Sequence, residues 1–103
     1  MIIQITASGA LELLERDNFK AFKIVAPATH ASAQALAAAL APIARLNDDG
    51  KTAWVSQDAL RQWQGRPQSA QWITAFDQMI ESVKRFGWVD EASGSVRGHI
   101  EIV

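Results

Sequence analysis

The sequence predicts one compact α+β domain over residues 1–103, in which about three helices pack on one face of a mostly antiparallel sheet. Three observations predict this class. Short β-branched or alternating segments are interleaved with longer segments of helical periodicity, turn signals separate them, and the length allows a single domain. The apolar fraction of 49% is typical of a folded chain rather than a disordered one.

The first part of the chain predicts two strands with a short element between them. Residues 2–6 form a β-branched strand. Residues 8–16 favour a short helix, and a strand continuing through Leu13 is the alternative. Residues 19–26 form the second strand, because apolar side chains alternate there onto one face: Phe22, Ile24 and Ala26.

Residues 29–46 predict a helix, because small and large apolar residues recur at helical spacing. Pro42 should kink or shorten this helix near its end, since proline lacks the backbone donor and clashes with the preceding turn. Residues 47–50, Asn-Asp-Asp-Gly, are a turn signal.

The second half predicts a strand and two helices. Residues 52–55 form a third strand, and residues 56–64 form a helix capped by Ser56. Residues 67–86 form the longest helix, which Gly87 ends.

The end of the chain predicts a C-terminal β-hairpin. Residues 88–90 enter it, residues 92–95 turn, and residues 96–103 return as a strand. Alternation places two sets of side chains on opposite faces of the returning strand: Val96, Ile100 and Ile102 on one, and Arg97, His99 and Glu101 on the other.

Charge and composition exclude several classes of protein. Ten basic and eleven acidic residues give a net charge of −1, so we expect no nucleic-acid partner unless the fold gathers the cations on one face. With no cysteine there is no disulfide or thiol nucleophile. The longest apolar run, residues 35–44, is shorter than the roughly 20 residues of a membrane span. No membrane partner and a cytoplasmic location are therefore the expectations.

The sequence contains no cofactor-binding or metal-binding motif with the required residues at the required spacing. A phosphate-binding loop ending at Gly50 needs a glycine where Arg45 stands, and a helix rather than a strand afterwards. An EF-hand on the same turn would have Arg45 as its first ligand, which cannot bind Ca²⁺. His30 and His99 are far apart and lack metal-ligand spacing. We therefore expect no cofactor and no metal.

The strand face of Arg97, His99 and Glu101 is the most chemical feature of the sequence. A histidine flanked by a guanidinium and a carboxylate can act as an acid or base, while the arginine orients an anionic substrate. An outward-facing polar strand is the plainer interpretation, and the sequence favours it.

Four tryptophans are a high count for this length, and they suggest either a binding surface or a core filled by large rings. Trp72 fits the apolar stripe of the long helix. Trp63 is surrounded by polar residues, so it is the best candidate for a contact surface.

We therefore expect a small non-enzymatic interaction or ligand-binding domain that self-associates as a homodimer, with Trp63, Arg97 and His99 as candidate binding residues. Two terminal strands, residues 2–6 and 96–103, could form exposed sheet edges and pair across chains. The alternative is a small acid–base enzyme with a pocket near Arg97, His99 and Glu101.

Overall fold

Six strands form one sheet with the order β2-β1-β3-β8-β5-β4 in a computed structural model that describes all residues, 1–103. The strands of the sheet are β1 (Ile2–Ile5), β2 (Leu11–Leu14), β3 (Lys23–Ala26), β4 (Ala44–Leu46), β5 (Thr52–Val55) and β8 (Val96–Ile102). The helices are α1 (Ala33–Leu40), α2 (Gln57–Arg61) and α3 (Ala70–Lys84), with a 3₁₀ turn at Ala28–His30. A separate two-stranded ribbon consists of β6 (Gln62–Trp63) and β7 (Arg66–Pro67).

The sheet is mixed, which corrects the expectation of a mostly antiparallel one. Strand β3 pairs in parallel with both β1 and β8, whereas β1 with β2, β4 with β5, and β5 with β8 are antiparallel. The parallel pairs join strands that are distant in sequence. Local turn signals predict hairpins and give no information on such pairs.

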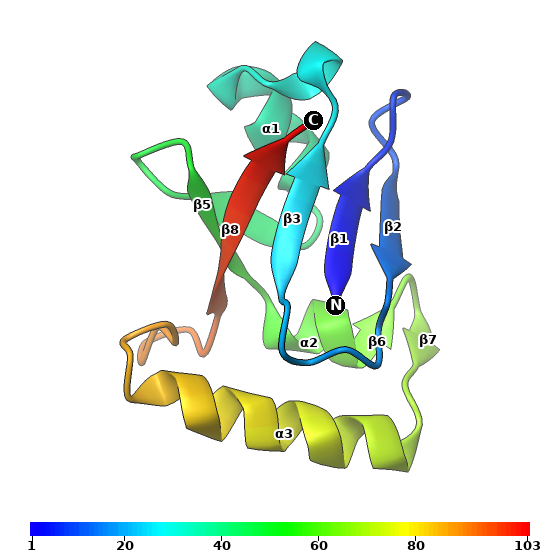
Figure 1. The fold of residues 1–103 in the computed structure, drawn as a ribbon, viewed down its shortest axis with the longest axis vertical. Coiled ribbons are helices and arrows are strands. Elements are labelled where there is room, and N and C mark those ends of the chain that lie inside the picture. The colour runs from blue at the N-terminus through cyan, green and yellow to red at the C-terminus, as the bar shows by residue number, and fades with distance from the viewer.

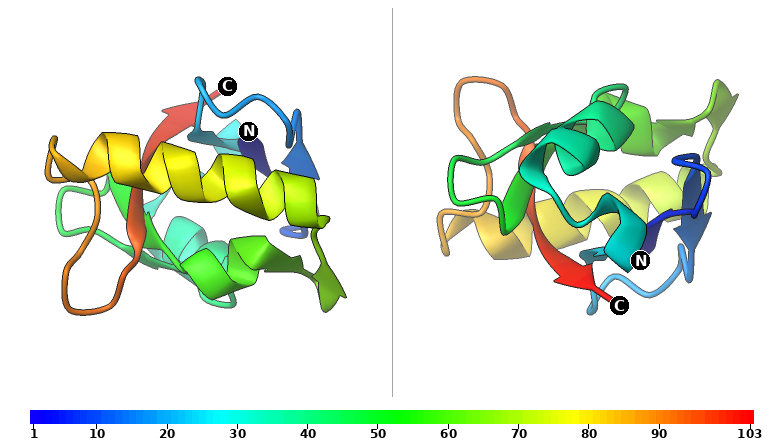
Figure 2. Two further views of the ribbon diagram at one scale, coloured as in Figure 1. Left: turned by 90° about the horizontal axis from the view of Figure 1, so that it is seen from below. Right: turned by 90° about the horizontal axis from the view of Figure 1, so that it is seen from above.

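The helices leave one face of the sheet uncovered. Figures 1 and 2 show α1 and α2 behind the sheet and α3 running across its lower end, while β8, β3, β1 and β2 lie side by side in front. We call this uncovered side the open face. The prediction of one mixed α and β domain with three helices is confirmed. None of the helices combines the length and apolarity needed to cross a membrane.

The helix predicted over residues 8–16 is wrong, and the strand alternative is the observed structure. Residues Leu11–Leu14 pair antiparallel with β1, with Ile3 opposite Leu13. Gly9 adopts a positive φ of 87° in the tight turn, where the Thr6 amide donates to the Ala10 carbonyl. The turn therefore joins two strands directly and leaves no room for a helix.

Two predicted helices are shorter than expected. The helix over residues 29–46 ends at Leu40, just before Pro42, and Ala44–Leu46 becomes strand β4 against β5. The helix over residues 56–64 is capped by Ser56 as predicted but ends at Arg61. Gln64 and Gly65 then adopt positive φ angles of 51° and 82° in the turn between β6 and β7.

The longest predicted helix is confirmed, although it begins after Pro67, which pairs with Gln62 in the β6–β7 ribbon, and ends before Phe86. It spans Ala70–Lys84, and the Ser69 hydroxyl accepts a hydrogen bond from the Trp72 amide at its start. Gly87, with a φ of 74°, lies just beyond its end.

The C-terminal strand lies inside the sheet rather than in an isolated hairpin. Only the bridge between Val89 and Val96 and the adjoining backbone hydrogen bonds remain of the predicted hairpin. Strand β8 is inserted between β3 and β5, and β1 lies between β2 and β3. The terminal strands are therefore interior, and the sheet edges are β2 and β4.

The core is entirely apolar and sits between the sheet and the helices. Eighteen buried hydrophobic residues form it, and no polar or charged residue is buried with them. Trp72 stacks on Phe76 with ring centroids 4.9 Å apart, and its indole Nε1 donates to the Arg16 carbonyl at 2.8 Å. This assembly ties α3 to the segment that follows β2.

Candidate functional site

Strand β8 presents its polar side chains on the open face. Buried and exposed residues alternate along it, so Arg97, His99 and Glu101 share the solvent side as predicted. Trp54 of β5 lies directly opposite Arg97. Lys23 of β3 lies beside His99.

A row of four side chains crosses this part of the open face. The strand register pairs Arg97 with Trp54, and Trp54 in turn with Arg45 of β4. On the other side, the Arg97 amide donates to the Trp88 carbonyl at 2.8 Å, next to the bridge formed by Val89. The order across the sheet is therefore Trp88, Arg97, Trp54, Arg45, an alternation of aromatic rings and guanidinium groups.

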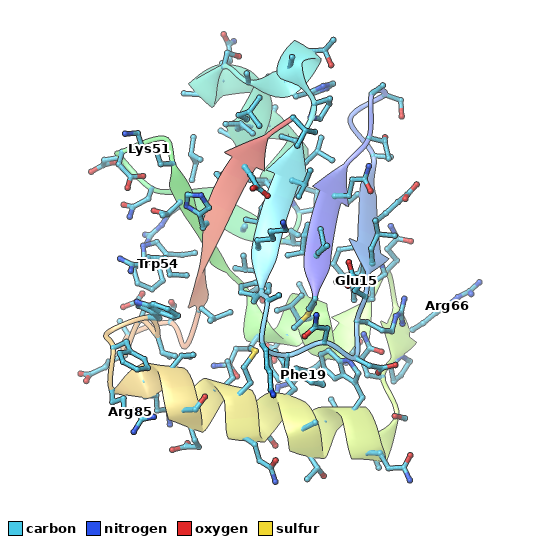
Figure 3. The ribbon with its side chains drawn as sticks, in the orientation of Figure 1. Glu15, Phe19, Lys51, Trp54, Arg66 and Arg85 are labelled. Carbon is cyan, nitrogen blue, oxygen red and sulfur yellow. The ribbon has the colours of Figure 1, made fainter.

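The row continues to the end of α3. The Arg97 guanidinium lies 5.8 Å from the Trp88 ring centroid, and the Phe86 and Trp88 rings are 5.4 Å apart. The Arg85 guanidinium lies 5.2 Å from the Phe86 ring. We call these six residues the aromatic–arginine strip: Arg45, Trp54, Arg85, Phe86, Trp88 and Arg97. Figure 3 shows Trp54 and Arg85 on the same side of the molecule, with Lys51 above them.

The arginines of the strip have no acceptor within the protein. The three ion pairs of the structure use Lys23, Arg61 and Lys84, and no side-chain hydrogen bond involves Arg45, Arg85 or Arg97. Each guanidinium carries five N–H donors in a planar fork that matches carboxylates and phosphates.

The rings beside these arginines are accessible. Phe86 is 59% exposed and Trp88 is 40% exposed, while Trp54 is partly buried. The strip therefore groups two exposed rings and one half-buried ring with three guanidinium groups that form no hydrogen bond or ion pair within the protein.

A carboxylate lies near one end of the strip. The Asp90 side chain accepts hydrogen bonds from the Ser93 hydroxyl at 2.7 Å and the Ala92 amide at 3.3 Å. These bonds, with a smaller contribution from the Arg45 charge, lower the pKa of Asp90 below its usual value. Asp90 is therefore ionised at neutral pH and offsets part of the Arg45 charge.

Glu101, the third residue of the predicted polar face, is paired with another strand. The Lys23 ammonium donates to its carboxylate at 2.8 Å. This hydrogen bond and the charge of Lys23 lower the pKa of Glu101. The carboxylate is therefore an ionised acceptor, unsuited to donate a proton as a general acid.

None of the five main cavities is lined by Arg97, His99 or Glu101. One of them, of 330 Å³, is lined by Arg45 and Trp54 of the strip. The most charged of them, of 680 Å³, lies between α2, α3 and the loop after α3, where Arg61 forms an ion pair with Asp77 at 2.6 Å. No three histidine and carboxylate side chains gather to hold a metal ion.

Trp63 is buried rather than displayed. It is 7% exposed and belongs to the core cluster, so its ring offers little surface for a flat contact. It does form part of the walls of two shallow cavities, of 520 Å³ and 560 Å³, together with Leu11 and Gln64. A binding role for Trp63 stays a prediction that now applies to a small ligand in these cavities.

The sequence does not reveal most of the strip. Arg45 falls in a predicted helix, and Arg85 and Phe86 look like an ordinary helix end. The sequence pattern joins Arg97 only to its neighbours on β8, whereas its partners in the strip come from β4, β5 and the segment after α3. The sheet register and the path of the chain after α3 bring these residues together.

Comparison with known proteins adds no identity, because no protein-family model matches the chain and no curated protein or solved structure matches it significantly.

Proposed function

We propose that this protein is a non-enzymatic interaction domain and that the aromatic–arginine strip on the open face is its binding surface. The observation that carries the proposal is the pairing of unsatisfied cations with accessible rings. Three guanidinium groups without protein acceptors lie beside Trp54, Phe86 and Trp88. Aromatic residues and arginine are the types that contribute most to binding energy at protein surfaces.

The geometry supports binding over the acid–base enzyme alternative. An enzyme pocket needs a concave, partly apolar space around its acid or base. Arg97, His99 and Glu101 instead lie exposed on one side of a strand, and Glu101 is held ionised by Lys23. This face can therefore present charged groups and aromatic rings to a partner.

A cytoplasmic location remains part of the proposal.

The proposal also includes self-association, through a surface separate from the strip. The edge strand β2 has no strand on its outer side, and Leu14 at its end is 39% exposed. An unpaired edge can pair with the same strand of a second copy around a two-fold axis. The Gln64 side-chain amide covers the Leu11 carbonyl at the opposite end of this edge, 2.9 Å away.

A probe with matching chemistry tests the binding surface without knowledge of the partner. An anilinonaphthalene sulfonate dye is aromatic and anionic, so it should bind beside Trp88 and Arg97. The test is a fluorescence titration of the folded wild type, the Arg97→Gln variant and the Arg66→Gln variant. Arg66 is also exposed, and Figure 3 shows it on the opposite side of the molecule from Trp54.

The proposed surface requires that Arg97→Gln weakens dye binding severalfold while Arg66→Gln leaves it unchanged. Equal binding by all three proteins would reject the strip as the binding surface. Loss of dye binding in the Trp63→Phe variant alone would place the dye in the two cavities beside the Trp63 ring. Circular dichroism of each variant confirms that the fold is retained.

A further inference from the structure

We propose that the aromatic–arginine strip binds single-stranded nucleic acid, with bases stacked on its rings and phosphates held by its guanidinium groups. This inference rests on the proposed function, because it names the partner of the same surface. Proteins that bind single strands combine a cationic track for the backbone with aromatic rings on which successive bases stack. The strip offers both on an uncovered sheet face.

The order of side chains suits an extended strand. Trp88, Arg97, Trp54 and Arg45 occupy neighbouring positions across the sheet. Neighbouring strands are about 4.8 Å apart, so the row spans about 14 Å, enough for a few unstacked nucleotides. A cation lies between the two tryptophan rings, where the phosphate joining two stacked bases would pass.

Phe86 and Arg85 lengthen the row in the same pattern. Phe86 is the most exposed ring of the strip, and the Arg85 guanidinium lies over it. The strip therefore presents three rings and three arginines in one continuous path from β4 to the end of α3. A lone ring or a lone cation would not define such a path.

Binding of nucleic acid depends on the local charge of the binding surface rather than on the net charge of the whole chain. The net charge of −1 predicted no nucleic-acid partner, under the condition that the cations stay scattered. The fold gathers Arg45, Arg85 and Arg97 on one surface. Lys51 lies at the upper end of the same side, but the Asp49 carboxylate accepts a hydrogen bond from its amide and offsets its charge. The charge of Arg45 contributes to lowering the pKa of Asp90, and the negative charge of Asp90 offsets part of the positive charge of the strip.

The exposed rings favour a single strand over a duplex or an acidic peptide. In a duplex the faces of the bases are already stacked, so the rings of Trp88 and Phe86 would gain no planar partner. An acidic peptide would engage the arginines and leave the rings without a matching planar group. Single-stranded nucleic acid is the ligand that uses both kinds of side chain.

Fluorescence anisotropy with a short labelled oligothymidylate tests the inference at low salt. Binding should weaken as salt rises, with log K falling against log salt at a slope of about −2, since three phosphate contacts each contribute about 0.7 on single strands. The duplex of the same length, a thymidine mononucleotide and polyglutamate should each bind at least tenfold more weakly.

Matched variants locate the contact. Trp88→Ala should weaken oligothymidylate binding about tenfold, which is within the range for loss of one stacked base. Arg97→Gln should reduce the magnitude of the salt slope by about 0.7. Ile102→Ala and Arg66→Gln are controls of similar exposure and charge outside the strip, and both should bind as the wild type does.

The outcomes separate this inference from the proposed function. Dye binding at Arg97 without oligothymidylate binding would overturn the nucleic-acid inference and leave the binding surface standing. Binding of polyglutamate or duplex as tightly as the single strand would also overturn it. Oligothymidylate binding that Trp88→Ala and Arg97→Gln leave unchanged would remove the strip as its site.

Discussion

The Arg97 guanidinium lies 5.8 Å from the centroid of the Trp88 ring, on a strand whose register also places Trp54 directly across from Arg97. Arg97 is therefore flanked by tryptophans from two different segments of the chain. Gly98, the next residue, lies on the core side of β8, where an added Cβ would come within 3.2 Å of Ile24 and 3.3 Å of Phe22. Close packing behind the strand thus fixes which side chains point outward.

Gly98→Val should destabilise the protein by about 1–3 kcal/mol, because the added methyl groups would overpack the space in front of Ile24 and Phe22. His99→Val is the matched control at the next position, where the side chain is exposed. It should change the free energy of unfolding by less than about 1 kcal/mol. Urea denaturation of both variants checks the prediction, and equal destabilisation would contradict this account of β8.

Trp72→Ala should destabilise the protein by about 3–5 kcal/mol, the range for removing a large buried aromatic side chain. Its ring is 5% exposed, stacks on Phe76 and donates to the Arg16 carbonyl. Trp88→Ala removes the same side chain from the surface and should cost far less. Thermal and urea unfolding of the two variants checks this prediction. Equal destabilisation by Trp72→Ala and Trp88→Ala would contradict it.

The pKa of Glu101 should lie below its usual value, and it should rise in Lys23→Met, since the Lys23 hydrogen bond and charge are the main causes of the lowering. A carboxylate with a lowered folded-state pKa stabilises the protein above its unfolded-state pKa. That stabilisation is lost as the pH falls through the folded-state pKa. An NMR titration of the Glu101 side chain measures both values. An unchanged pKa in Lys23→Met would show that the ion pair does not form in solution.

Sedimentation velocity at micromolar concentration should show a dimer that Leu14→Lys weakens. The lysine places like charges together where two β2 edges would meet. Ile102→Lys is the control, because Ile102 is similarly exposed, at 43% against 39%, but lies on the interior strand β8. A monomeric wild type would remove self-association from the proposed function without touching the strip.

The sequence predicts local elements better than it predicts their neighbours. The periodicity of residues 67–86 and the cap at Ser56 are local properties, and both are found in the structure. The leucine spacing in residues 8–16 fits both a helix and a strand, and pairing with β1 selects the strand. Pro42 predicts that the helix over residues 29–46 is kinked or shortened, but it does not predict the strand β4 that follows.

The candidate site depends on contacts that periodicity does not encode. Alternation along residues 96–103 was enough to place Arg97 and His99 on one side of a strand. It could not show that the strand is interior, or that Trp54 and Arg45 extend its row. The polar sequence neighbours of Trp63 predict a contact surface, yet its ring is buried in the core cluster.

The four tryptophans provide the most direct test of the binding surface, because each indole N–H gives its own NMR signal. Trp54 and Trp88 belong to the strip, whereas Trp63 and Trp72 are buried. In a titration of isotope-labelled protein with oligothymidylate, the account predicts that the Trp54 and Trp88 indole signals shift together while those of Trp63 and Trp72 stay in place. Shifts confined to Trp63, or no shift at Trp54 and Trp88, would contradict it.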